Sequence, residues 1–390
     1  MKNIIGKISI VLALLFLASS VIEAIPAFGR KYQMSCQTCH APFPKLKAYG
    51  EEFAGNGFVL ADKDAPRYYM PTGDDQLSLI RDIPLALRLE GYVTYNNRQS
   101  KQLDFTAPNI LKILSGGALT DNVAYYFYFF FSERGEVAGI EDAFIMFNNL
   151  FDTEVDLVVG QFQVSDPLFK RELRLTLEDY NIYKVKTGYA KADLSYDRGI
   201  MLTYGLPTGT DFTLEILNGN GIGHANNLRV FDNDKNKIFA GRISQEVSEW
   251  FRIGAFGLYG KENLENSLNM KFTNTVSVWG PDFSLIPSDK LEFNFQYLQR
   301  TDKKPDLFLN NLQTSGGFGE LIYMPNGDES KWYAVALYNW IDSDDKTLKY
   351  SSATLSLGYL LRRNIRMIGE YTYDTERKFG QFSVGVISAF

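Results

Sequence analysis

Residues 379–390, at the C-terminal end of the chain, read FGQFSVGVISAF. Apolar side chains stand at alternate positions at Phe382, Val384 and Val386, with serine and glycine between them. Successive side chains of a β-strand point to opposite faces of a sheet, so this alternation predicts a strand with one apolar face. The predicted strand runs to the terminal residue, Phe390.

The same period of two recurs through residues 80–390. The clearest example alternates large apolar residues with Glu, Asn and Gln between Leu291 and Tyr297, and shorter ones are centred on Leu214 and Leu87. Stretches typical of turns separate such segments. About sixteen antiparallel strands of about ten residues, with their turns, would occupy about 300 residues, which fits this region. The turn-like stretches lie at 218–221, 325–328 and 342–345.

A mainly β fold, a transmembrane antiparallel β-barrel, accounts best for this pattern. A soluble β-sandwich or a lipocalin-like barrel is the alternative, and the mean hydropathy of −0.17 would suit either class. A membrane barrel has no strongly apolar window, however, because lipid-facing and lumen-facing residues alternate. The aromatic content of 14% suits the aromatic girdles of such barrels. An alternating last strand that ends in phenylalanine, here Phe390, also resembles the assembly signal of outer-membrane barrels.

Residues 1–24 have the pattern of a secretory signal peptide. Lys2 and Lys7 precede an apolar run from Ile8 to Leu17, and a small residue, Ala24, follows. An uncleaved membrane anchor is the alternative, but a helix that crosses a bilayer needs about 20 apolar residues. We therefore expect an exported chain that resides in the bacterial outer membrane, in contact with its lipid.

The strongest chemical signal is Cys36-Gln-Thr-Cys39-His40, which contains both cysteines of the chain. In this pattern two thiols attach to a porphyrin and the histidine supplies an axial ligand to iron. A Cys36–Cys39 disulfide, a thioredoxin-like dithiol and a structural zinc site are alternatives. The dithiol would need a βαβ context, and zinc would need about four ligands. The adjacent histidine favours one covalently bound haem c, with His40 as a metal ligand.

Residues 25–79 are expected to form a small cytochrome c-like domain around this motif. Phe43, Leu46, Gly50 and Phe53 recur at spacings of three and four, which predicts one short helix with an apolar face. Phe43, Leu46 and Phe53 would keep the haem dry and so tune its potential. The haem propionates would need cationic partners, for which Arg30, Lys31 and Lys45 are candidates, together with an inward-folding run at 170–174.

The second axial ligand remains open on the sequence. Met70 is best placed, since a flexible span follows His40, and a methionine ligand would raise the haem potential. Met34 lies too close to the attachment site to reach the opposite face easily. His224, in a Gly-rich stretch of the strand region, is an alternative, as is an open position.

The segment around the motif resembles the fused cytochrome–porins of bacterial outer membranes, whose best-known members are iron oxidases. The likeness rests on Ala27-Phe-Gly-Arg30, the motif itself, Phe43-Pro-Lys-Leu46, Gly50, Phe53 and Gly57-Phe58. Gly29 stands where alanine is commoner, and Phe58 where tyrosine is common. The resemblance implies one haem c, a porin-like barrel and electron transfer across the outer membrane, with iron:cytochrome c oxidoreductase activity as the possible enzymatic role.

These features lead to one functional expectation and two rivals. The chain would carry single electrons between an extracellular donor, Fe(II) or another reductant, and a soluble periplasmic cytochrome. The rivals are a solute-diffusion porin whose haem domain acts as a redox gate or plug, and an electron exporter that works in the opposite direction. The net charge of −6 argues against nucleic acid as a partner and favours cations. Porin-like barrels are often trimers, so a homo-oligomer is possible.

Overall fold

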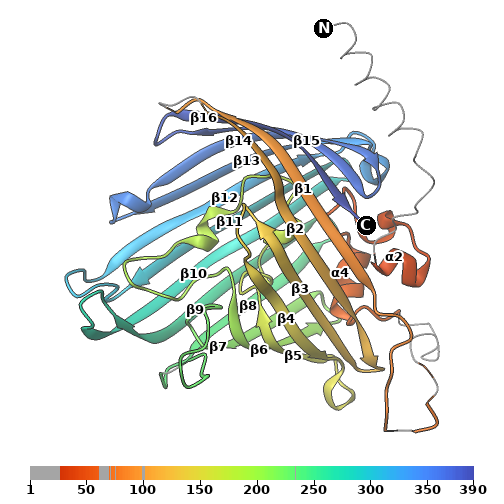
Figure 1. Cartoon of the computed structure of the whole chain (residues 1–390), viewed down its shortest axis with the longest axis horizontal. Helices are drawn as coiled ribbons and strands as arrows, with labels where there is room; N and C mark the ends of the chain where they lie inside the picture. The colour runs from red at the N-terminus through yellow and green to blue at the C-terminus, as the bar shows by residue number, and fades with distance from the viewer. Residues whose placement is uncertain (1–26, 61–69, 71, 75, 99–101, 233) are drawn as a thin grey trace, which may run out of the picture.

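The computed structural model describes residues 27–60, 70, 72–74, 76–98, 102–232 and 234–390. The predicted signal peptide, residues 1–24, lies outside these described residues. Within them, sixteen antiparallel strands form a closed barrel in which each strand pairs with its neighbours in sequence and β1 pairs with β16 (Figure 1). The predicted fold class and strand number are therefore confirmed for the barrel.

The strands are connected as a simple up-and-down meander. No helix in the described part of the chain is long and apolar enough to cross a membrane. The helices are α2 (Ala27–Tyr32), α3 (Cys36–Cys39) and α4 (Ala48–Gly55), and the strands are β1 (Leu85–Asn96), β2 (Gln102–Thr120), β3 (Val123–Glu133), β4 (Gly139–Phe147), β5 (Val155–Phe162), β6 (Asp197–Leu206), β7 (Thr210–Leu217), β8 (Ile238–Ser248), β9 (Phe251–Glu265), β10 (Lys271–Ser288), β11 (Leu291–Asp302), β12 (Leu312–Tyr323), β13 (Trp332–Ser343), β14 (Tyr350–Arg362), β15 (Ile365–Asp374) and β16 (Phe379–Ala389).

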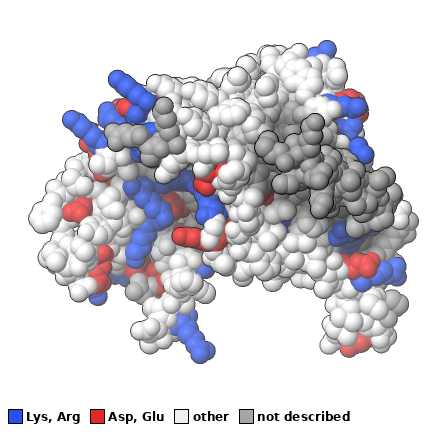
Figure 2. Space-filling view, turned by 45° about the horizontal axis from the view of Figure 1, so that its top comes forward, with Lys and Arg blue, Asp and Glu red and all other residues white. Residues whose placement is uncertain are grey.

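The barrel is apolar outside and polar inside. On β11, Glu292, Asn294 and Gln296 are buried in the interior, while the alternating aromatic residues point outward. On β16, Phe382 is 48% exposed and Ser383 is 2% exposed. A soluble barrel or sandwich would bury the opposite faces, so this distribution rejects the soluble alternative and places the outer wall in lipid. Much of the wall visible in Figure 2 is free of charged side chains.

The two ends of the barrel differ in the length of their connections. Short turns join β2 to β3, β6 to β7 and β14 to β15, whereas segments 163–196 and 218–237 connect strands at the other end. Barrels of the bacterial outer membrane have short turns on the periplasmic side and long loops outside. The end with the short turns is therefore the periplasmic end. It also carries α2–α4 and the C-terminal residue (Figure 1).

Residues 163–196, here called the luminal loop, fold into the barrel. Val164 and Tyr183 in this loop are completely buried, and the Tyr180 ring stacks on Phe318 of β12 at 4.0 Å between centroids. Backbone groups of the loop also bond to the inner wall, since the amides of Leu177 and Glu178 donate to the carboxylate of Glu370 on β15 at 2.7 and 2.8 Å. The loop thus narrows the lumen.

Candidate functional site

The predicted haem-attachment motif lies on a short turn at the periplasmic end. Helix α3 places Cys36 and Cys39 at its two ends, and Ser35 caps it by accepting a hydrogen bond from the amide of Gln37. The amide of His40 donates to the carbonyl of Cys36 at 2.8 Å. Both cysteines are free thiols, and burial raises the pKa of each. One turn of backbone thus presents two sulfur atoms and an imidazole together.

The His40 ring is held in an orientation suited to iron. Its Nδ1 atom lies 2.8 Å from the Pro44 carbonyl oxygen, and a donor at Nδ1 leaves Nε2 as the free lone pair. Burial lowers the pKa of His40, although the carbonyl groups of Pro44 and Lys45 oppose the shift. The neutral imidazole is the form that binds metals. Phe43 contacts the ring edge-on at 5.2 Å.

The predicted helix from Phe43 to Phe53 is too long. Helix α4 begins only at Ala48, and Leu46 instead forms a β-bridge with His40. Pro44 lacks an amide hydrogen, and prolines disfavour helical backbone at the residue before them, which explains the late start. Phe43 and Leu46 are therefore placed beside the motif by a turn rather than by a helical face.

Gly50 and Phe53 of α4 pack within residues 27–58. A Cβ atom on Gly50 would lie 2.4 Å from the carbonyl oxygen of Cys39, so this glycine lets α4 approach the motif backbone closely. Phe53 is buried among Phe28, Tyr32 and Phe58, with ring centroids 5.4–5.7 Å apart. Its contribution to a dry haem site stays a prediction.

The other candidates, Arg30, Met70 and His224, lie outside the turn that carries the motif. The Arg30 side chain donates to the carbonyl of Leu85 at the start of β1. Met70 is 51% exposed and its amide bonds to Leu79, so its role as second axial ligand stays a prediction. His224 is exposed in segment 218–237, which joins β7 to β8 at the end opposite the motif, and this position disfavours it as a ligand.

Residues 27–58, here called the motif segment, lie across the periplasmic mouth. The Phe58 ring stacks on Tyr126 of β3 at 5.5 Å, and the Lys45 ammonium group is 2.7 Å from the Glu292 carboxylate on β11. In the described ring of sixteen strands, β3 and β11 are eight positions apart (11 − 3 = 8), which puts them on opposite walls. Gln37 also donates to the Asp328 carbonyl at 2.8 Å, beyond β12.

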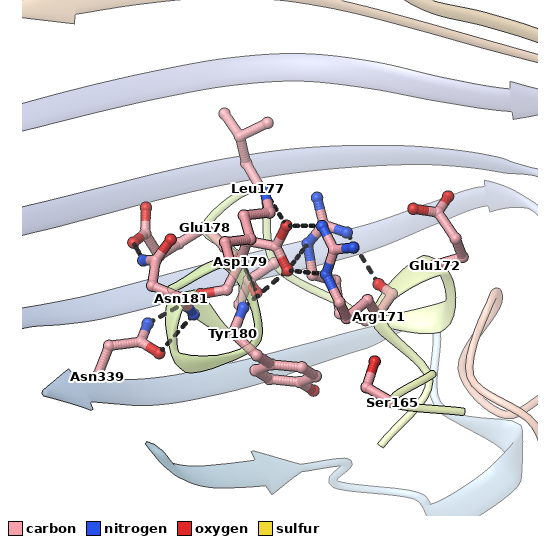
Figure 3. Close-up of polar contacts among 12 residues, drawn as sticks. Ser165, Arg171, Glu172, Leu177, Glu178, Asp179, Tyr180, Asn181 and Asn339 are labelled. Atoms are coloured by element: carbon pink, nitrogen blue, oxygen red, sulfur yellow. Dashed lines mark hydrogen bonds and ion pairs between the residues drawn. The ribbon is translucent and has the colours of Figure 1, made fainter. Parts of the chain in front are cut away.

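The luminal loop carries the inward-folding run at 170–174. Arg171 donates two hydrogen bonds to Asp179, at 2.7 and 3.2 Å, and both side chains are buried (Figure 3). Asn339 of β13 donates to the Asp179 carbonyl at 3.0 Å. Glu51 of the motif segment acts electrostatically on Lys170. The expectation that this run folds inward agrees with the structure, whereas pairing with propionates stays a prediction.

Two hollows follow one another along the lumen. An open vestibule of 550 Å³ at the extracellular end is lined by Lys184 and Tyr350 among others. A narrow gap of 20 Å³ lies between the luminal loop and the wall formed by β1 and β15, next to Arg88 and Arg366. Arg366 was not among the site residues predicted from the sequence. The sequence feature that could have identified it is a charged residue at a lumen-facing position of an alternating strand.

Two groups of acidic residues, Asp232 with Asp234 and Asp342 with Asp344 and Asp345, lie in or beside turns. Asp234 accepts hydrogen bonds from the amides of Asn236 and Asn263, and Asp345 caps a short helical turn at 346–348. Asp342 is paired with the Lys349 ammonium group at 2.6 Å. In the described part of the chain, no group of three or more His, Cys, Asp or Glu side chains is arranged to hold a metal ion.

Comparisons with known proteins define the class of fold. No family model and no curated protein match the sequence. Solved structures match at low identity: the anion-selective porin from Comamonas acidovorans (10% identity, TM-score 0.56, 79% of this chain and 99% of that one) and the channel DcaP of Acinetobacter baumannii (15%, 0.54, 79% and 97%). The chain has the fold of a sixteen-stranded outer-membrane porin.

Another similar structure is OmpT of Vibrio cholerae with loop L8 deleted, at 13% identity and a TM-score of 0.54, covering 79% of this chain and 99% of that chain. One form of OmpT is described as a trimer. These likenesses, with the lipid-facing outer wall, confirm the expected location in the bacterial outer membrane. The match covers the barrel fold, and the division into a haem domain and a barrel stays a prediction.

Proposed function

We propose that the protein is an outer-membrane channel of the porin type whose periplasmic mouth is closed by a segment carrying one haem c. The observation that carries the proposal is the contact of the motif segment with opposite barrel walls, at Tyr126 and at Glu292. The polar lumen and the extracellular vestibule support a path for small hydrophilic solutes. The motif segment then acts as a plug at the far end of this path.

The residues at the motif fit the proposed cofactor. The two thiols stand on one helical turn, and His40 keeps Nε2 free because Nδ1 is tied to the Pro44 carbonyl oxygen. Cys36 and Cys39 would form the thioether bonds and His40 would be one axial ligand. When bound, haem c supplies reversible one-electron chemistry at its iron. The chain itself holds the imidazole, with Phe43 edge-on to its ring, and Phe43 and Leu46 would exclude water around it.

The plug can be tested by its ion pair with the barrel. In Lys45→Met, the carboxylate of Glu292 keeps its burial but loses its partner, which should cost the docked state roughly 1–3 kcal/mol. Single-channel recordings of the full-length protein in planar bilayers should then show an open probability at least about fivefold above wild type. Lys349→Met, which removes the exposed ion pair with Asp342 in an extracellular loop, is the matched control.

The same recordings separate the gate from the channel. Reduction of the wild-type protein with dithionite should change the open probability if the haem acts as a redox gate. Conductance that ignores oxidation state would reject the gate but keep the channel. Absence of current from wild type and Lys45→Met alike would reject the channel itself.

An electron carrier is the second candidate, because the Cys-x-x-Cys-His motif and the oriented His40 ring serve that role as well. An external donor such as Fe(II), with a soluble periplasmic cytochrome as acceptor, would fit its position in the membrane. The channel is preferred because the narrow gap is lined by several arginines, which disfavour a divalent cation on its way to the motif.

A visible spectrum decides this second candidate. Anaerobic addition of Fe(II) to the oxidised full-length protein near neutral pH should produce the bands of a reduced c-type haem within seconds if it is an iron oxidase. Reduction by dithionite but not by Fe(II) would argue against iron as the donor. Lack of any c-type spectrum in protein made with a functional haem-attachment system would remove the cofactor from both candidates.

A further inference from the structure

We infer that the narrow gap in the lumen binds a small anion between Arg174 of the luminal loop and Arg366 of β15. The inference names the solute class of the proposed channel and in that respect rests on it. The binding site itself is argued from the charges, contacts and space around the two guanidinium groups.

Three of the four carboxylates that line the gap already have ion-pair partners. Glu90 is paired with Arg88, Glu172 lies 2.7 Å from the Lys112 ammonium group, and Asp179 is held by Arg171 at 2.7 Å and also by Lys184. These pairs occupy Arg88 and Arg171, leave Arg134 and Arg366 without an ion pair among the described residues, and leave Arg174 only a long contact with Asp179. The charged residues that line the gap are Arg88, Arg134, Arg171, Arg174, Arg366, Glu90, Glu133, Glu172 and Asp179.

Arg366 is the buried arginine of the gap that has the fewest partners. Its side chain is 1% exposed, and its Nη1 atom donates to the Tyr333 hydroxyl at 2.6 Å and to the Leu175 carbonyl at 3.3 Å. Its Nε atom is buried without a hydrogen-bond partner. The described carboxylates form no ion pair with Arg366, and Glu90, which acts on it electrostatically, is already paired with Arg88. A guanidinium group does not lose its proton, so burial without a counter-ion is costly.

Arg174 faces the gap from the loop side. Its Nη1 atom donates to the Arg171 carbonyl at 2.8 Å, while its Nε atom lies 3.9 Å from the Asp179 carboxylate and has no hydrogen bond. Asp179 already accepts both hydrogen bonds of Arg171. Two guanidinium groups that border one cavity, each with an unused N–H, are donors suited to an anion.

The space available limits the size of the ligand. The volume of the gap, 20 Å³, accommodates a halide ion or the end of a small carboxylate, since one water needs about 10–15 Å³ of such space. The vestibule outside has Arg134, Lys184, Lys186 and Arg377 in its lining against Glu178 and Asp179. Arg134, Leu177 and Asp179 line both hollows, so a cationic entrance leads directly to the gap.

Crystals of the full-length protein grown in sodium bromide provide the direct test. An anomalous bromide peak is expected within hydrogen-bonding distance of the guanidinium groups of Arg174 and Arg366. The peak should vanish in Arg366→Met and persist in Arg362→Met, a matched control whose arginine is exposed at the same end of the barrel. If the methionine variant fails to fold, Arg366→Lys takes its place. This variant keeps the charge and should retain a weaker peak.

Electrical measurements separate this inference from the channel function. Under a KCl gradient, Arg366→Met should lower the chloride-to-potassium permeability ratio at least about threefold, whereas Arg362→Met should not change it. Bound bromide without any conductance would keep the site and reject the channel. Conductance without a bromide peak and with unchanged selectivity would keep the channel and overturn the site. Density for a haem propionate at Arg366 would confirm an anion site and assign its ligand to the cofactor.

Discussion

Gly57 marks the point where the motif segment meets the barrel wall. Its φ angle is +64°, and a Cβ atom there would lie 2.5 Å from the Cβ of Ala124 and 2.8 Å from the side-chain nitrogen of Asn148. Both the left-handed backbone and the close approach require glycine. The next residue, Phe58, makes the ring contact with Tyr126. A change of backbone conformation at Gly57 would therefore displace Phe58 and weaken the contact of the motif segment with the wall.

We expect Gly57→Ala to loosen the motif segment from the barrel. The left-handed conformation costs a non-glycine residue roughly 1–2 kcal/mol, and the collision with Ala124 adds to this. Limited proteolysis of the folded, full-length protein should therefore cut within residues 27–58 several times faster than in wild type.

Gly73→Ala is the control for this prediction. Gly73 also has a positive φ angle, +75°, but nothing lies within 4 Å of the Cβ position. It therefore measures backbone strain without the collision. Equal cleavage rates of the motif segment in the two variants would contradict a specific contact between Gly57 and the wall.

For single residues, the sequence predicted which side chains carry reactive groups better than it predicted the local backbone conformation. The motif at Cys36, Cys39 and His40 could be identified directly, because covalent attachment demands fixed spacing. The helix expected from Phe43 to Phe53 begins only at Ala48, because a spacing of three and four does not distinguish a helix from a proline-containing turn. The partner of Gly50 could not be predicted, because it is a backbone carbonyl brought close by folding.

Among the elements, the luminal loop has the largest effect on the lumen. It is attached around the inner wall, since Glu262 of β9 accepts hydrogen bonds from the amides of Lys191 and Ala192, and Arg300 of β11 donates to the carbonyls of Val185 and Ala192. These contacts hold the loop rigidly across the channel. The pair formed by Arg171 and Asp179 closes its most polar turn (Figure 3).

Arg171→Met should release this turn without unfolding the barrel. The buried carboxylate of Asp179 would lose its bidentate partner, at a cost of about 3 kcal/mol to the docked loop. Amide hydrogen exchange in residues 170–184 should then become roughly a hundredfold faster, while exchange in the strands stays unchanged.

Lys186→Met provides the comparison, because it removes the ion pair of a largely exposed lysine with Asp193 in the same loop. Exposed pairs contribute about 0–1 kcal/mol, so little change in exchange is expected. If both variants exchange alike in residues 170–184, the bidentate pair does not hold the turn.

For the whole molecule, the distribution of charge matters more than its sum. The net charge of −6 suggested a preference for cations, and on that basis Fe(II) was a reasonable extracellular donor. The folded chain instead gathers five arginines around the narrow gap, against four acids. Strand positions that face the lumen contribute to the field inside, whereas loop acids such as Asp342 are exposed outside.

The sequence by itself determined the barrel, its approximate strand number and the Cys-x-x-Cys-His motif. These features are local: a period of two needs only neighbouring residues, and a covalent motif needs only a fixed spacing. Tertiary structure alone decided that the motif segment crosses the mouth, that the luminal loop narrows the channel and that Arg366 lacks a counter-ion. Each of these depends on residues far apart in the chain, such as Lys45 with Glu292 and Leu177 with Glu370, which only closure of the barrel brings together.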